Sequence, residues 1–136
     1  MARIERFKDI EAWQAARKLM QMVYAVSTKG SFARDYRLRD QIQGSAISVM
    51  SNIAEGFDAS RDAEFIRFLG YARRSASELQ SQLYIALDQD YIDQQQFEDI
   101  YQQAEETKRL IGGFIRYLQI SLQSEVLKPK VPSPKS

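Results

Sequence analysis

Apolar residues recur every three or four positions through four long stretches of this chain, and these stretches cover almost all of residues 9–123. Such a period places the apolar side chains on one face of a helix. The connections between the stretches are short, and short connections favour antiparallel neighbours. No strand pattern competes with this periodicity. The sequence therefore predicts an all-α fold, an up-down-up-down antiparallel four-helix bundle.

Capping and turn residues set the expected limits of the four helices. They are expected to open at Asp9, Asp35, Ser60 and Asp93. The second helix is expected to run to about Gly56, and the stretch from Gly56 to Ser60 to supply its stop, because glycine commonly follows a helix end. Gly112 and Gly113 fall inside the fourth helix, where they are either a hinge or close crossing, or a weak spot that costs about 1 kcal/mol per glycine.

The length of 136 residues suits a single domain with one core. We expect this domain to cover residues 1–124. The last nine residues contain all three prolines, three lysines and no acidic residue. Residues 125–136 are therefore expected to form a disordered basic tail.

The chain contains neither Cys nor His, and this excludes several kinds of chemistry. Disulfides, thiolate metal sites, imidazole general bases and Glu-x-x-His di-iron sites cannot be built. No cofactor, metal or small-molecule substrate is predicted. The N-terminus lacks the apolar run of a signal peptide, and no stretch reaches the length of a membrane span. A cytoplasmic protein without membrane contact is expected.

A stripe of small and polar residues runs along the second predicted helix, beside its apolar face. Its members are Ser45, Ser48, Asn52 and Glu55. A buried amide without hydrogen-bond partners costs about 1–3 kcal/mol, so the stripe predicts a specific contact. An acid-base pair of Glu55 and Glu78 is one interpretation, but no nucleophile or metal shell accompanies it. The sequence favours a buried network within the protomer or a subunit interface, formed by Ser48, Asn52, Glu55, Arg74, Ser75 and Glu78.

Positive charge is concentrated in the first part of the chain. Residues 1–79 hold 13 Lys and Arg against 10 Asp and Glu, whereas residues 80–127 hold 3 against 8. The candidate residues for contacts with nucleic-acid phosphates are Arg34, Arg37, Arg39, Arg73, Lys128, Lys130 and Lys135. With a pI near 7.9, this pattern is more typical of a solvated surface in a monomer. A ring would repeat the patch and favour binding.

Three segments together resemble a known protein family. They are Phe-Lys-Asp-Ile-Glu-Ala-Trp-Gln at residues 7–14, Leu-Arg-Asp-Gln-Ile at 38–42 and Ser-Val-Met-Ser-Asn-Ile-Ala-Glu-Gly at 48–56. They resemble the four-helix-bundle proteins encoded in intervening sequences of bacterial 23S ribosomal RNA genes, and the resemblance covers roughly residues 7–120. The chain departs from the family pattern at Ala33, where a Pro is usual, at Gln43-Gly44, where a basic pair is usual, and at Arg74, where a Gly is usual.

The resemblance implies a protein without established enzymatic activity. The family is similar in fold to the accessory protein of diversity-generating retroelements, a basic pentameric barrel that binds nucleic acid and a reverse transcriptase. It therefore implies a homo-oligomer, a pentamer by this analogy, that binds RNA or a nucleic-acid enzyme. The alternative is a structural or interaction module that acts through a protein partner and has no nucleic-acid contact.

Overall fold

The computed structural model describes residues 4–127, and this part of the chain contains helices and no strand. The predicted all-α class is therefore confirmed. The helices are η1 (Phe7–Asp9), α1 (Glu11–Ser27), α2 (Gly30–Arg34), α3 (Tyr36–Asp58), α4 (Asp62–Asp88) and α5 (Gln94–Leu127).

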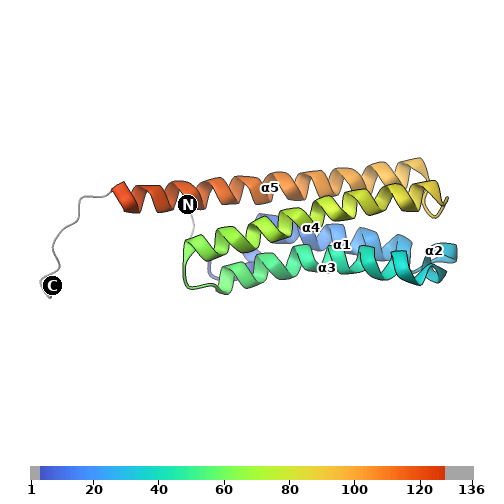
Figure 1. Ribbon diagram of the computed structural model, residues 1–136, viewed down its shortest axis with the longest axis horizontal. Coiled ribbons are helices and arrows are strands. Elements are labelled where there is room, and N and C mark those ends of the chain that lie inside the picture. Colours follow the sequence, from blue (N-terminus) through green and yellow to red (C-terminus); the bar gives the residue numbers. More distant parts are fainter. Residues whose placement is uncertain (1–3, 128–136) are drawn as a thin grey trace, which may run out of the picture.

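The four long helices, α1, α3, α4 and α5, lie side by side (Figure 1). α3 packs against α4, α4 against α5, and α1 against both α3 and α5. Hydrogen bonds join Ser45 to Glu78 and Ser48 to Ser75, so the residue numbers rise along α3 as they fall along α4. These pairings fit the predicted up-down-up-down order.

The core consists of two clusters of buried apolar residues that follow one another along the bundle. One cluster is built around Leu19, Ile42, Leu79 and Leu83. The other is built around Val49, Ile53, Leu69 and Ile111. Each of these fully buried side chains stabilises the fold by about 1.5–3 kcal/mol relative to an exposed one. Because the apolar stripes come from all four long helices, the core holds them together as one unit.

The short helix α2 closes one end of the bundle, and the sequence did not predict it. Gly30 begins it with φ of +58°, a conformation that glycine adopts without steric cost. Phe32 is 1% exposed and stacks on Tyr91, with 5.3 Å between ring centroids. The Tyr91 hydroxyl donates a hydrogen bond to Asp35 Oδ2 at 2.9 Å, and this bond raises the pKa of Tyr91. The other oxygen of Asp35 caps α3 by accepting from the Leu38 amide at 3.1 Å.

Two of the predicted helix starts are confirmed and two are wrong. Asp93 caps α5 in a reciprocal pair with Gln96, since each accepts a hydrogen bond from the other's amide. Asp35 caps α3 as described. Asp9 instead lies in η1, and Ile10 precedes α1. Ser60 is also not a cap, because α4 begins after Arg61 without a side-chain cap.

Helix α3 ends at Asp58, within the Gly56 to Ser60 stretch that was expected to stop it. Gly56 is buried where α3 meets α4, and a Cβ there would lie 2.6 Å from Phe65 Cδ1 and 3.0 Å from Phe68 Cβ. The position therefore needs glycine for a close helix approach rather than for a helix end.

Helix α5 runs through Gly112 and Gly113 without interruption and reaches Leu127. It thus continues past residue 124, where the bundle was expected to end. The rest of the expected tail, residues 128–136, lies outside the described residues.

Candidate functional site

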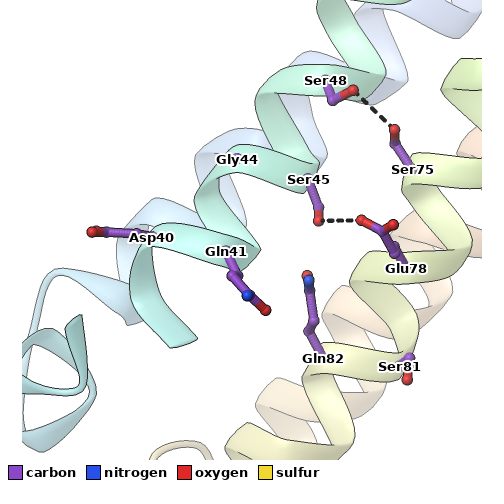
Figure 2. A pocket seen from close by; sticks show the side chains of 9 residues that line it. All are labelled: Asp40, Gln41, Gly44, Ser45, Ser48, Ser75, Glu78, Ser81 and Gln82. Carbon is purple, nitrogen blue, oxygen red and sulfur yellow. Dashed lines mark hydrogen bonds between the residues drawn. The ribbon is translucent and has the colours of Figure 1, made fainter. Parts of the chain in front are cut away.

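An open groove with a volume of about 530 Å³ lies between α3 and α4 (Figure 2). The polar stripe of α3 forms one wall, and polar residues of α4 form the other. The residues that line the groove are Asp40, Gln41, Gly44, Ser45, Ser48, Ser75, Glu78, Ser81 and Gln82.

Two hydrogen bonds cross the groove and join its walls. Ser75 Oγ donates to Ser48 Oγ at 2.9 Å, and Ser45 Oγ donates to Glu78 Oε2 at 3.3 Å (Figure 2). Ser45 is buried, whereas Glu78 is exposed. The small serine side chains let the two helices approach closely while their hydroxyl groups find partners across the contact.

Asn52 extends this set of contacts along α3. It is half-buried, and its Nδ2 donates to the Ser48 carbonyl at 2.8 Å and to Ser48 Oγ at 3.0 Å. The structure thus brings Ser48, Asn52 and Ser75 together. Among the described residues, no hydrogen bond links Glu55 or Arg74 to them, and both side chains are exposed. Arg74 instead lies 5.7 Å from the centre of the Tyr71 ring.

Gln82 is a groove residue that the sequence reasoning missed. Its Oε1 is buried and accepts no hydrogen bond within residues 4–127. Figure 2 shows Gln82 and Gln41 extending into the groove from opposite helices. Spacing in the sequence could have identified Gln82, since it follows Ser75 by seven residues and Glu78 by four and so lies on the same helical face. The groove therefore offers an unused acceptor beside the Glu78 carboxylate and several hydroxyl groups.

A second polar cluster, also not predicted, joins α4 to α5. Gln80 is buried, and its Nε2 donates to Glu105 Oε1 at 2.8 Å while its Oε1 accepts from Lys108 Nζ at 3.1 Å. The hydrogen bond from Gln80, followed by the positive charge of Lys108, lowers the pKa of Glu105. Gln80 is thus satisfied on both sides, and the cluster fixes the register of the two helices.

The candidate carboxylates Glu55 and Glu78 are far apart. Glu78 lies level with Ser45, its hydrogen-bond partner. Glu55 is ten residues further along α3, which is roughly 15 Å along the helix. The structure therefore does not bring them together as an acid-base pair. The described residues also hold no group of three or more His, Cys, Asp or Glu placed to bind a metal ion.

The candidate arginines near the start of α3 differ in their surroundings. Arg34, in α2, and Arg37 are exposed. Arg39 is engaged within the protein, because it pairs with Asp40 at 3.0 Å and donates to the Ala33 carbonyl at 3.0 Å. It also lies 4.8 Å from the centre of an exposed tyrosine ring.

Arg73 is exposed on α4 and does not join this group. The register of Ser48 and Ser75 places Arg73 level with Met50. That level is roughly 16 Å along the bundle from Arg39. The candidate arginines thus form two separate patches. The candidate lysines Lys128, Lys130 and Lys135 lie outside the described residues.

The fold and the sequence both resemble known proteins. A solved protein of unknown function from the S23 ribosomal protein family of Bacteroides thetaiotaomicron VPI-5482 has a similar fold, with a TM-score of 0.72 and 24% identity over 80% of this chain and 98% of that chain. At that identity the likeness concerns the fold. A comparison with curated proteins finds no match.

No helix in residues 4–127 is long and apolar enough to cross a membrane. The sequence profile of the 23S rRNA-intervening sequence proteins matches residues 8–113, which is most of the chain. The family description names no reaction. With this match and the shared helical fold, the chain belongs to the family of 23S rRNA-intervening sequence proteins.

Proposed function

We propose that this protein is a non-enzymatic scaffold that assembles with copies of itself and binds RNA weakly. The observation that carries the RNA proposal is the state of the arginines. Arg34, Arg37 and Arg73 are exposed and form no ion pair within residues 4–127, whereas Arg39, Arg67 and Arg109 are all paired with carboxylates. Guanidinium groups without a carboxylate partner are free to neutralise phosphates, and an assembly repeats them.

The α3–α4 groove is the proposed contact between copies. Gly44 and the serines leave room for a helix or a long side chain, and Gln82 supplies an acceptor. Glu78 places a carboxylate in the groove, which complements exposed arginines elsewhere on the same chain. A contact between two different patches is heterologous, and such contacts generate a ring when the rotation between copies closes. A pentamer is the size that the family resemblance implies.

Assembly is expected to depend on the groove. Light scattering should show a closed oligomer of the wild-type protein at micromolar concentrations. Gly44→Trp should shift it to smaller species while the helical circular dichroism is retained, because Gly44 is exposed and a Cβ there meets nothing within 4 Å. Gly44→Ala is the matched control and should keep the oligomer, since a methyl group leaves the groove open. A wild-type monomer across micromolar concentrations would contradict this prediction.

A catalytic role has no support in the geometry. Glu55 and Glu78 are separated along α3 and α4, and the hydroxyl of Ser45 donates only to the exposed Glu78 carboxylate, which is a weak base for activating a hydroxyl. We therefore place the function in binding.

The second candidate is a module that acts through a different protein and does not contact nucleic acid. The free acceptor of Gln82 and the open groove support this candidate as much as they support self-assembly, because a helix of another protein would fit the same walls. RNA binding by the intact assembly separates the two candidates.

Changing both Arg34 and Arg37 to Gln is expected to weaken binding of all RNA sequences several-fold. The salt dependence should flatten by about 0.7 log units per log unit of salt for each single-strand phosphate that the variant no longer neutralises. Fluorescence anisotropy with labelled RNA measures both quantities. The double variant Arg67→Gln, Arg109→Gln removes the same charge from ion-paired positions and is the matched control. Equal effects of the two double variants would show a general charge effect and contradict specific contacts.

A further inference from the structure

Two arginines from different helices converge over a pair of glycines on the α4–α5 side of the bundle. A Cβ on Gly112 would lie 3.6 Å from Arg73 Nη1 and 3.8 Å from Arg116 Nη1. A Cβ on Gly113 would lie 3.9 Å from Arg116 Nη2. Both guanidinium groups therefore lie within 4 Å of one point, closer together than the Debye length of about 8 Å at physiological salt.

The register of α4 and α5 explains why the two arginine side chains meet. Gln80 faces Glu105 across the two helices, and the same antiparallel register brings Arg73 level with Gly112. Arg116 begins one turn further along α5, and helical side chains lean toward the helix N-terminus. Its guanidinium group is thereby carried back over Gly112 and Gly113.

Carboxylates do not neutralise this pair. Within residues 4–127, neither Arg73 nor Arg116 forms an ion pair. Glu105 and Glu106, the acidic residues on the preceding turns of α5, are paired with Lys108 and Arg109. Asp9 and Glu11 line a neighbouring cavity with Arg116, between α1 and α5, but neither pairs with it. Two cations held together without a counter-ion attract an anion to the space between them.

Gly112 is buried, and the guanidinium groups of Arg73 and Arg116 lie at van der Waals distance from the position of its missing side chain. A side chain longer than hydrogen at residue 112 would fill the space beneath both guanidinium groups. Gly70, which precedes Arg73 by three residues on α4, also has open space where its Cβ would be. Gly112 therefore lets the two arginines lie close to α5, and Gly70 leaves open space beside them on α4.

We propose that Arg73 and Arg116 form a two-arginine clamp for one phosphate group, supplied by the backbone of RNA. Each planar guanidinium presents several donors in a fixed fork that matches the oxygens of a phosphate. The clamp would position a phosphate and read no base. This inference rests on the proposed RNA binding and assigns Arg116, which the sequence reasoning did not select.

Arg73→Gln and Arg116→Gln should each lower RNA affinity several-fold, measured by fluorescence anisotropy on the intact assembly. The double variant should lose little more than either single one, because both side chains hold the same phosphate. Arg74→Gln is the matched control, with the same change of charge at an exposed neighbouring residue that lies beside Tyr71. It should change affinity by less than about twofold. Equal effects of Arg73→Gln and Arg74→Gln, or fully additive effects in the double variant, would overturn the clamp.

A charge-neutral variant tests the geometry itself. Gly112→Leu should displace both guanidinium groups and lower RNA affinity as Arg73→Gln does, while circular dichroism shows that the helices are retained. Wild-type affinity in this folded variant would overturn the clamp.

The clamp and the proposed function fail in different ways. If Arg73→Gln and Arg116→Gln bind RNA as the wild type does while the Arg34 and Arg37 variant is weakened, the clamp is wrong and RNA binding stands. If the wild-type protein binds no RNA, inorganic phosphate is titrated against the Arg73, Arg116 and Gly112 N–H resonances. Shifts at these resonances would support a phosphate site whose source is not RNA, and unchanged resonances would overturn the clamp.

Discussion

Replacing Phe32 by alanine is expected to lower the free energy of unfolding by about 3–5 kcal/mol, although Phe32 belongs to a helix of only five residues. The ring is 1% exposed, and it packs against Tyr91 in the cluster that also holds Leu83. Truncation would leave a cavity at the end of the bundle where α2 closes it. The substitution would also remove the aromatic contact that places Tyr91 against Asp35.

Urea unfolding followed by circular dichroism measures this cost. Tyr36→Ala is the matched control, since Tyr36 is a nearby aromatic residue at 64% exposure, with the Arg39 guanidinium carbon 4.8 Å from its ring centre. Its truncation should cost about 1 kcal/mol or less. If Phe32→Ala unfolded at the same urea concentration as the control, α2 would be a surface turn and not part of the core.

Gly56→Ala is expected to destabilise the protein by about 1–3 kcal/mol, even though alanine is the better helix former. The added methyl group would lie 2.6 Å from the ring of Phe65 and 3.0 Å from Phe68 Cβ. The ring of Phe65 is buried, and Phe68 Cβ is fixed to the backbone of α4, so α3 and α4 would have to separate.

Gly70→Ala provides the contrast, because a Cβ at Gly70 meets nothing within 4 Å. It should raise stability by about 0.5–1 kcal/mol through helix propensity alone. Thermal or urea unfolding of both variants gives the comparison. A Gly56→Ala variant that is stabilised as much as Gly70→Ala would mean that α3 and α4 do not approach closely at this point.

The sequence predicted the long helices well because their apolar residues repeat over many turns. α2 could not be predicted in this way, since five residues cannot show a helical period, and Phe32 is buried only by its contact with Tyr91 from a distant segment. The close helix contact at Gly56 could not be predicted from the sequence either. Its neighbours Phe65 and Phe68 follow in the next helix, and their distance depends on how closely the two helices pack.

The candidate site was predicted in part. Spacing along one helix placed Ser48 and Asn52 on one stripe, and the structure shows the predicted Ser75 of the facing helix hydrogen-bonded to Ser48. Contacts between helices depend on their register, which the sequence alone does not determine. For this reason the charge pattern grouped Arg39 with Arg73 and did not indicate the approach of Arg73 to Arg116.

Fluorescence anisotropy of labelled RNA, titrated with the intact assembly at low salt and then at rising salt, tests the central proposal most directly. We expect weak binding at up to tens of micromolar protein, with little preference for base sequence. The logarithm of the binding constant should fall with the logarithm of salt concentration by about 0.7 for each single-strand phosphate neutralised. Absence of binding at tens of micromolar, by a protein that light scattering shows to be assembled, would contradict the proposal and favour the scaffold that acts through a protein partner.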